Sequence, residues 1–208
     1  MTFILMAPRR IGEAERYLRS GKWLGGRMDL GTTVRGKRLG ILGLGRIGKA
    51  VARRAEVFGL HIAYHDIKPM GDLLYRSYPS LLDLANASDI LLVACEGGEA
   101  NRGLVDGKAL AALGPEGFLV NAARGPIIDQ PALISALRDG GIAGAAMDVF
   151  DGEPEVPAEL MAMENVVLTP HIASSTHETR RAMADLVYDN IRAHFDGKPV
   201  LTPVPPQI

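Results

Sequence analysis

The chain of 208 residues contains a single cysteine, Cys95, few aromatic residues and no excess of charge of either sign. One thiol excludes an internal disulfide framework and a multi-cysteine metal site, and no pair of histidines has metal-ligand spacing with a carboxylate. The formal net charge of −1 offers no basic surface to nucleic acid or an anionic membrane. The apolar opening run is too short to span a bilayer and lacks the layout of a signal peptide. We therefore expect a cytoplasmic protein without a metal, nucleic-acid or membrane partner.

What the chain does contain is apolar, strand-forming sequence interrupted by glycine. Hydrophobic residues make up 47% of it, which suffices for the core of one or two domains. An apolar strand at 37–42 runs directly into the pattern Gly43-x-Gly45-x-x-Gly48, and a helix is predicted to follow. In such a turn the first glycine permits the tight bend, the second lets a pyrophosphate approach the backbone, and the third lets helix and strand pack closely.

This turn predicts a dinucleotide site; the alternative is a glycine-tolerant turn in an ordinary doubly wound domain. Phosphates would meet free N–H groups and the dipole at the helix N-terminus, where Arg46 and Ile47 also lie and Arg46 adds a charge. A second strand at 61–65 ends in Asp66. An acidic residue about twenty positions after the turn accepts hydrogen bonds from a ribose diol.

Strands and helices alternate along the chain, which is typical of a parallel sheet with helices on both faces. We therefore predict an α/β fold, a doubly wound parallel sheet of the Rossmann NAD-binding type. The predicted strands are 37–42, 61–65, 74–77, 89–94, 117–121, 142–149 and 165–169. The predicted helices are 8–23, 47–58, 80–87, 107–113, 131–138 and 176–195. Ser175 and Glu178 form a capping box before the last helix, and an extended tail is expected at 202–206.

Three loops that follow predicted strands carry Arg124, Glu153 and His171. Such loops place ligands at the carboxyl edge of a parallel sheet. Hydride transfer to a 2-oxo acid puts negative charge on the carbonyl oxygen, which requires a proton donor and a fixed positive charge. His171 can donate the proton, Glu153 can stabilise the imidazolium, and Arg124 can bind the carbonyl and the neighbouring carboxylate. The plainer alternatives are an arginine that caps a loop carbonyl and a solvated acid before a proline.

With these residues in view, the chain resembles the D-isomer-specific 2-hydroxyacid dehydrogenases, through their coenzyme-binding domain. The resemblance rests on four ordered motifs, Gly43–Gly48, Asn121–Gly125, Asp148–Phe150 with Glu153–Pro154, and Thr169–His171. The segments 91–95 and 101–105 are most similar to hydroxypyruvate, glyoxylate or hydroxyphenylpyruvate reductases.

The resemblance implies a 2-oxo acid reductase whose catalytic residues are Arg124, Glu153 and His171. Its implied cofactor-binding residues are Gly43, Gly45, Arg46, Ile47, Gly48, Asp66, Ala94, Cys95, Asn101, Ala122, Ala123, Arg124, Asp148 and His171. Among them, Asp148 matches the position that usually holds the nicotinamide carboxamide.

The sequence departs from this family in two respects. Relatives of this type often have an uncharged residue and an arginine after the second strand, which accept a 2′-phosphate, whereas Asp66 and Ile67 stand here. A carboxylate repels phosphate, so we expect NAD ahead of NADP, although Lys68 keeps NADP open. In the family a substrate-binding domain precedes the first helix, and we expect that domain to be missing from this chain.

We therefore divide the chain into a segment at 1–25 for interdomain or dimer contacts, a Rossmann domain at 26–172, and a C-terminal helix and tail at 173–208. The implied small-molecule partner is a 2-oxo or 2-hydroxy acid. Apolar surface at 8–23, with Leu24 and Met28, predicts a homodimer. Two alternatives stay open, namely an NAD-binding regulatory module like the corepressors related to this family, and an inactive gene fragment.

Overall fold

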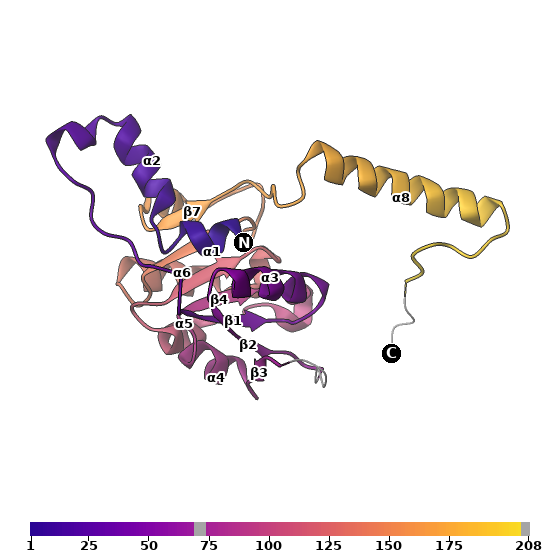
Figure 1. The fold of residues 1–208 in the computed structure, drawn as a ribbon, viewed down its shortest axis with the longest axis horizontal. Coiled ribbons are helices and arrows are strands. Elements are labelled where there is room, and N and C mark those ends of the chain that lie inside the picture. Colours follow the sequence, from indigo (N-terminus) through magenta and orange to yellow (C-terminus); the bar gives the residue numbers. More distant parts are fainter. Residues whose placement is uncertain (69–73, 205–208) are drawn as a thin grey trace. The chain divides into compact units, whose positions relative to one another are not determined.

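The computed structural model describes residues 1–68 and 74–204. The chain divides into two compact units, Met1–Pro170 and His171–Ile208. The first unit contains a seven-stranded sheet of order β3-β2-β1-β4-β5-β6-β7, in which neighbouring strands are parallel (Figure 1). The predicted doubly wound parallel sheet is thereby confirmed.

The strands are β1 Arg38–Leu42, β2 His61–His65, β3 Arg76–Ser77, β4 Ile90–Val93, β5 Phe118–Asn121, β6 Gly144–Met147 and β7 Val166–Leu168. Every residue of β4, β5 and β6 is buried, as expected for strands covered on both faces. The ends of each strand differ from the predicted ends by at most two residues, which is the usual difference at element boundaries.

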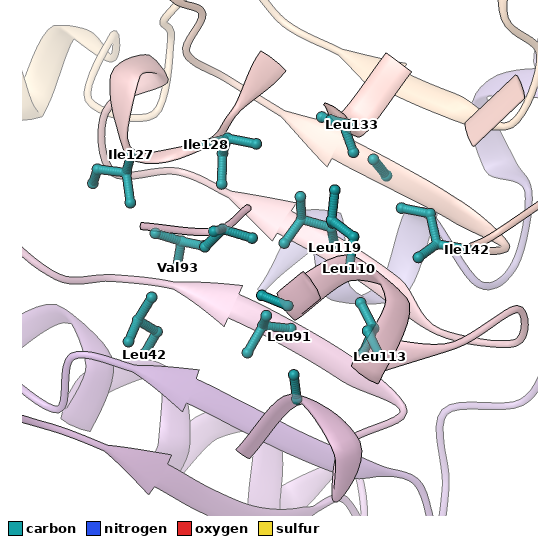
Figure 2. Packing of buried hydrophobic residues seen from close by; sticks show 14 of the residues in the cluster. Leu42, Leu91, Val93, Leu110, Leu113, Leu119, Ile127, Ile128, Leu133 and Ile142 are labelled. Atoms are coloured by element: carbon teal, nitrogen blue, oxygen red, sulfur yellow. The ribbon is translucent and has the colours of Figure 1, made fainter. Parts of the chain in front are cut away.

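Helices cover the two faces of the sheet and enclose two hydrophobic clusters. The helices of this unit are α1 Thr2–Met6, α2 Ile11–Arg19, α3 Arg46–Val57, α4 Leu81–Asn86, α5 Gly107–Leu113, α6 Gln130–Arg138 and α7 Ala158–Ala162. One cluster joins Ile4 of α1 and Ala52 of α3 to the sheet. The other joins α4, α5 and α6 through Leu84, Leu110 and Leu133. Figure 2 shows Leu110 and Leu133 of this cluster. Successive strand residues alternate between the clusters because side chains on a strand point to opposite faces.

The predicted helix at 8–23 is wrong in its length. The helix α2 spans Ile11–Arg19, and a short 3-10 turn, η1, follows at Lys22–Gly25. Arg10 has a φ of +53° and Gly21 a φ of +73°, so the chain leaves the right-handed helical region at both ends of α2. A glycine in the left-handed region is a common stop signal for a helix. All residues of α2 remain at least partly exposed.

In the second unit, α8 spans His177–Phe195 and begins differently from the prediction. Thr176, not Ser175, is the N-cap, and its hydroxyl accepts a hydrogen bond from the Thr179 N–H at 3.1 Å. The Ser175 hydroxyl instead accepts from the Arg180 guanidinium at 3.2 Å. Two adjacent hydroxyl residues are both competent caps, so the local pattern alone does not choose between them. Pro205 and Pro206 of the predicted tail lie outside the described residues.

Across the two described stretches, 1–68 and 74–204, no helix combines the length and the apolar composition that crossing a bilayer would require.

Candidate functional site

The glycine-rich turn connects β1 to α3 and is packed tightly on its inner side. Gly43 has a φ of +91° and donates its N–H to the His65 carbonyl oxygen at 2.9 Å. A Cβ on Gly48 would lie 2.3 Å from the Gly43 oxygen, so only glycine allows helix and turn to approach this closely. Around the corresponding position on Gly45, the described part of the chain leaves open space for 4 Å. A ligand can therefore reach the backbone of the turn at Gly45.

Asp66 lies against this turn although it is 22 residues away in sequence from Leu44. Its Oδ2 accepts a hydrogen bond from the Leu44 N–H at 2.7 Å, and its Oδ1 accepts one from the Lys68 N–H at 3.0 Å. The carboxylate thus connects the end of β2 to the glycine turn. A carboxylate offers more acceptor positions than these two bonds use, so acceptors remain for a ribose.

A cavity of about 660 Å³ lies beyond the carboxyl ends of β4 and β5. Ile47 at the start of α3 contributes to its wall, together with the loops that follow β4 and β5. Of the predicted cofactor residues, the wall includes Ile47, Ala94, Cys95, Ala122, Ala123 and Arg124. Burial raises the pKa of the Cys95 thiol, which keeps it protonated at neutral pH.

Asn121 shapes the loop that carries Arg124. Its side chain is fully buried, and its Nδ2 donates to the Arg124 carbonyl oxygen at 3.0 Å while its Oδ1 accepts from the Ala123 N–H at 3.0 Å. The amide therefore satisfies both of its ends inside the turn it closes. The Arg124 guanidinium is exposed on the cavity wall and donates to the Ala123 carbonyl oxygen at 2.7 Å.

The loop that carries Glu153 is attached to the loop that carries Arg124. A Cβ on Gly125 would lie 1.9 Å from the Phe150 carbonyl carbon, so the two backbones are in direct contact. Glu153 folds back within its own loop, where its Oε1 accepts from the Phe150 N–H at 2.9 Å. Arg102, from the loop after β4, donates to the Asp151 carboxylate at 3.0 Å. Three loops at the carboxyl edge are thereby joined.

Asp148 follows β6 and is 2% exposed. Its carboxylate accepts a hydrogen bond from the Thr169 hydroxyl. His171 is the first residue of the second unit and has a φ of +53°, in the left-handed region that residues other than glycine rarely adopt. Backbone strain of this kind is concentrated at functional sites.

Some predicted cofactor residues do not line the cavity. Asn101 closes its own loop, because its Nδ2 donates to the Glu96 carbonyl oxygen at 2.8 Å. Arg46 is exposed as the first residue of α3. The sequence reasoning missed other wall residues, namely Glu96, Gly97, Gly98, Glu99, Arg102, Pro126 and Ile127. These residues lie in loops after β4 and β5, so taking those whole loops as candidates would have found them.

These features fit a dinucleotide. The strand order reverses at β1, which has β2 on one side and β4 on the other. The glycine turn follows β1 and Cys95 follows β4, so the cavity lies at the topological switch point where open α/β sheets bind their ligands. Free N–H groups at the N-terminus of α3 suit a pyrophosphate.

Comparison with known proteins gives a consistent picture. A family model described as the NAD binding domain of D-isomer specific 2-hydroxyacid dehydrogenases matches residues 1–173. The chain is 54% identical to a glyoxylate/hydroxypyruvate reductase of Arabidopsis thaliana and 50% identical to a hydroxyphenylpyruvate reductase of Plectranthus scutellarioides. Each alignment covers 97% of this chain and 64% of the relative.

A solved structure is similar over nearly the whole chain. It is an NADPH-dependent glyoxylate/hydroxypyruvate reductase from Sinorhizobium meliloti in complex with NADP and malonate, with a TM-score of 0.92 and 45% identity. The match covers 97% of this chain and 64% of that one. The chain thus spans less than two thirds of the length of these relatives.

Proposed function

Because the chain belongs to the D-isomer specific 2-hydroxyacid dehydrogenases, through their NAD-binding domain, we propose that it supplies the coenzyme-binding half of the active site of a 2-oxo acid reductase. The observation that carries the proposal is the cavity at the switch point, where Ile47 and Arg124 line one space. A bound nicotinamide dinucleotide supplies the hydride for such a reaction. The similar proteins are glyoxylate/hydroxypyruvate and hydroxyphenylpyruvate reductases, which supports one of these small 2-oxo acids as the substrate.

The preferred coenzyme in this proposal is NAD. Asp66 lies against the glycine turn, where the adenosine ribose of a dinucleotide is bound in this fold. Its carboxylate accepts hydrogen bonds from the 2′- and 3′-hydroxyls and repels a 2′-phosphate. The Sinorhizobium relative is NADPH-dependent, so members of the family use NAD or NADP. The negative charge of Asp66 supports NAD as the coenzyme of this chain.

The reaction chemistry is assigned to Arg124, His171 and Glu153, and the binding of the nicotinamide carboxamide to Asp148. Arg124, exposed on the cavity wall, binds the carbonyl and carboxylate oxygens of the 2-oxo acid through parallel N–H groups. His171 donates a proton to the carbonyl oxygen as negative charge develops there. Glu153 stabilises the charged imidazole ring, and Asp148 accepts a hydrogen bond from the nicotinamide carboxamide.

We assign a homodimer to this chain as well. Around α2, large apolar side chains are exposed, with Leu18 at 58%, Trp23 at 67% and Leu24 at 97%, whereas Met28 is half-buried. A second copy of the chain, related by a two-fold axis and packed on this segment, would remove these side chains from water. Light scattering on the chain at micromolar concentration should give the mass of a dimer, and a monomer mass would contradict the assignment.

The test of the function separates binding from turnover. The 208-residue chain should bind NADH in a calorimetric titration, and the same sample should reduce glyoxylate or hydroxypyruvate only negligibly when NADH absorbance is followed. Positioning of the substrate accounts for about 7–11 kcal/mol of barrier lowering. This chain covers only 64% of the length of the relatives that are named as reductases. Absence of NADH binding would contradict the proposed function. Turnover within tenfold of an ordinary enzyme would contradict the assignment of only half of the active site to this chain.

A further inference from the structure

Asp148 and Thr169 face each other across the ends of two adjacent strands. Met147 of β6 and Leu168 of β7 are register partners, so the next residue of each strand continues the pair. The Thr169 N–H donates to the Met147 carbonyl oxygen at 3.0 Å, and the Thr169 hydroxyl donates to Oδ1 of Asp148. The Thr169 side chain is therefore directed at a carboxylate that is 2% exposed.

This pair lies one strand away from the wall of the cavity. The Asp148 N–H donates to the Asn121 carbonyl oxygen at 3.0 Å, and the residues after Asn121, Ala122 and Ala123, line the cavity. In a doubly wound sheet the adenosine half of a dinucleotide occupies the side of the glycine turn, so the nicotinamide half lies toward β5 and β6. A carboxylate has only acceptors, so it recognises N–H donors such as a carboxamide.

We propose that Thr169 is a positioning residue for the nicotinamide, because its hydroxyl fixes the Asp148 carboxylate in the orientation that accepts a hydrogen bond from the carboxamide. This inference rests on the proposed function. A hydroxyl has a single proton, and donating it to Asp148 leaves the carboxylate as a pure acceptor toward the ligand. Thr169 is suited to this task because its β-branched side chain has few rotamers and Pro170 restricts its backbone to extended conformations.

The alternative is that the same hydrogen bond serves only to connect the ends of β6 and β7. The two readings differ in what they predict for different parts of the dinucleotide. A connecting bond would affect all ligands of the cavity alike, whereas a positioning bond affects only the ligand that carries the carboxamide. ADP-ribose contains the adenosine, pyrophosphate and second ribose of NADH without the nicotinamide. Its affinity therefore distinguishes a positioning bond from a connecting bond.

The experiment uses calorimetry to measure the affinities for NADH and for ADP-ribose of the unmodified chain and of three variants. Thr169→Val removes the hydroxyl at nearly constant volume, Thr169→Ser restores it, and Thr33→Val is a matched control at an exposed threonine before β1. The valine variant should bind NADH about tenfold more weakly, the size expected when a hydrogen bond to a charged group is lost. Its affinity for ADP-ribose should stay within twofold, and the serine and control variants should keep both affinities within twofold.

Equal weakening of both ligands by Thr169→Val, or no weakening of NADH, would overturn the inference. If the valine variant does not fold, Thr169→Ala is interpreted in the same way, and loss of folding in both would overturn it by making the hydroxyl a requirement for folding. An unmodified chain that binds neither ligand contradicts the proposed function itself. An unmodified chain that binds NADH no more tightly than ADP-ribose leaves nucleotide binding intact and overturns this inference alone.

Discussion

Gly43 and Cys95 are in direct backbone contact beyond the ends of the adjacent strands β1 and β4. A Cβ on Gly43 would lie 2.5 Å from the Cα of Cys95, and the φ of Gly43 is +91°. Glycine is therefore required at this position for two independent reasons, the left-handed backbone and the close approach of the neighbouring loop. The contact fixes the first turn of the dinucleotide site against the wall of the cavity.

Gly43→Ala should accordingly abolish or strongly weaken NADH binding. The alanine would have to leave the left-handed region or displace the Cys95 backbone, at a cost of about 1–3 kcal/mol for the conformation alone. Gly140 provides a matched control because it also has a positive φ, of +71°, with open space around its Cβ position among the described residues. Gly140→Ala should lower the thermal midpoint yet leave the NADH affinity within twofold. Equal loss of affinity in both variants would contradict this account.

Asp66 should determine the choice between NADH and NADPH. The unmodified chain should bind NADH well ahead of NADPH, and Asp66→Ala should cost about 1.5–3 kcal/mol of NADH binding, the value typical of a hydrogen bond to a charged group. Because Asp66 also accepts from the Leu44 N–H, Asp66→Asn is the sharper variant. This variant keeps one oxygen acceptor for the Leu44 N–H and removes the charge, so it should reduce the ratio of NADH affinity to NADPH affinity. Calorimetric titration of both nucleotides tests this, and equal affinity in the unmodified chain would refute it.

His171 should affect turnover and not coenzyme binding. In an active enzyme that contains this chain, His171→Gln should lower turnover by about 10²–10⁴-fold with nearly unchanged NADH affinity, because a general acid acts mainly in the transition state. Because Glu153 is proposed as the anionic partner of the His171 imidazolium, Glu153→Gln should shift the pH optimum of reduction toward acid. Steady-state pH profiles measure both effects. A pH profile that Glu153→Gln does not change would show that Glu153 serves only to hold its own loop.

Arg38 and Asp89 should make stability depend on pH in the acid range. Asp89 accepts from the Arg38 backbone N–H at 2.7 Å and from its guanidinium at 2.9 Å and 3.1 Å. The side-chain hydrogen bond from Arg38 is the main reason why the pKa of Asp89 lies below its ordinary value. A carboxyl group whose folded pKa is depressed stabilises the fold above its unfolded pKa, and that stabilisation is lost as the pH falls through the folded pKa.

Asp89→Asn should therefore lower the free energy of unfolding by about 1–2 kcal/mol at neutral pH, a figure reduced for the exposure of the Arg38 side chain. The difference from the unmodified chain should shrink as the pH is lowered from about 5. Denaturant unfolding at several pH values measures it. Asp139→Asn, which breaks an exposed pair with Arg138, should change stability less, and a pH-independent difference for Asp89→Asn would refute the explanation.

The sequence by itself determined the parallel sheet, the helices α3 to α6 and the glycine turn, but it did not predict the short helices α1 and α7. These features are encoded locally, since buried strands read as short apolar runs and a tight turn before a helix needs glycine at fixed spacing. Where two local signals compete, the sequence was insufficient. Ser175 and Thr176 are equally good caps, and the hydrophobic spacing at 8–23 continued across the left-handed residues that end α2.

The tertiary structure alone decided which distant residues meet. The bond between Asp66 and the Leu44 N–H, the packing of Gly125 on Phe150, and the hydrogen bond from Thr169 to Asp148 each join segments on different strands or loops. Such contacts depend on the register of neighbouring strands and on the close approach of loops, which no periodicity within one segment encodes. The sequence therefore identified the residues capable of the chemistry, whereas the fold decided how their backbones and carboxylates are oriented.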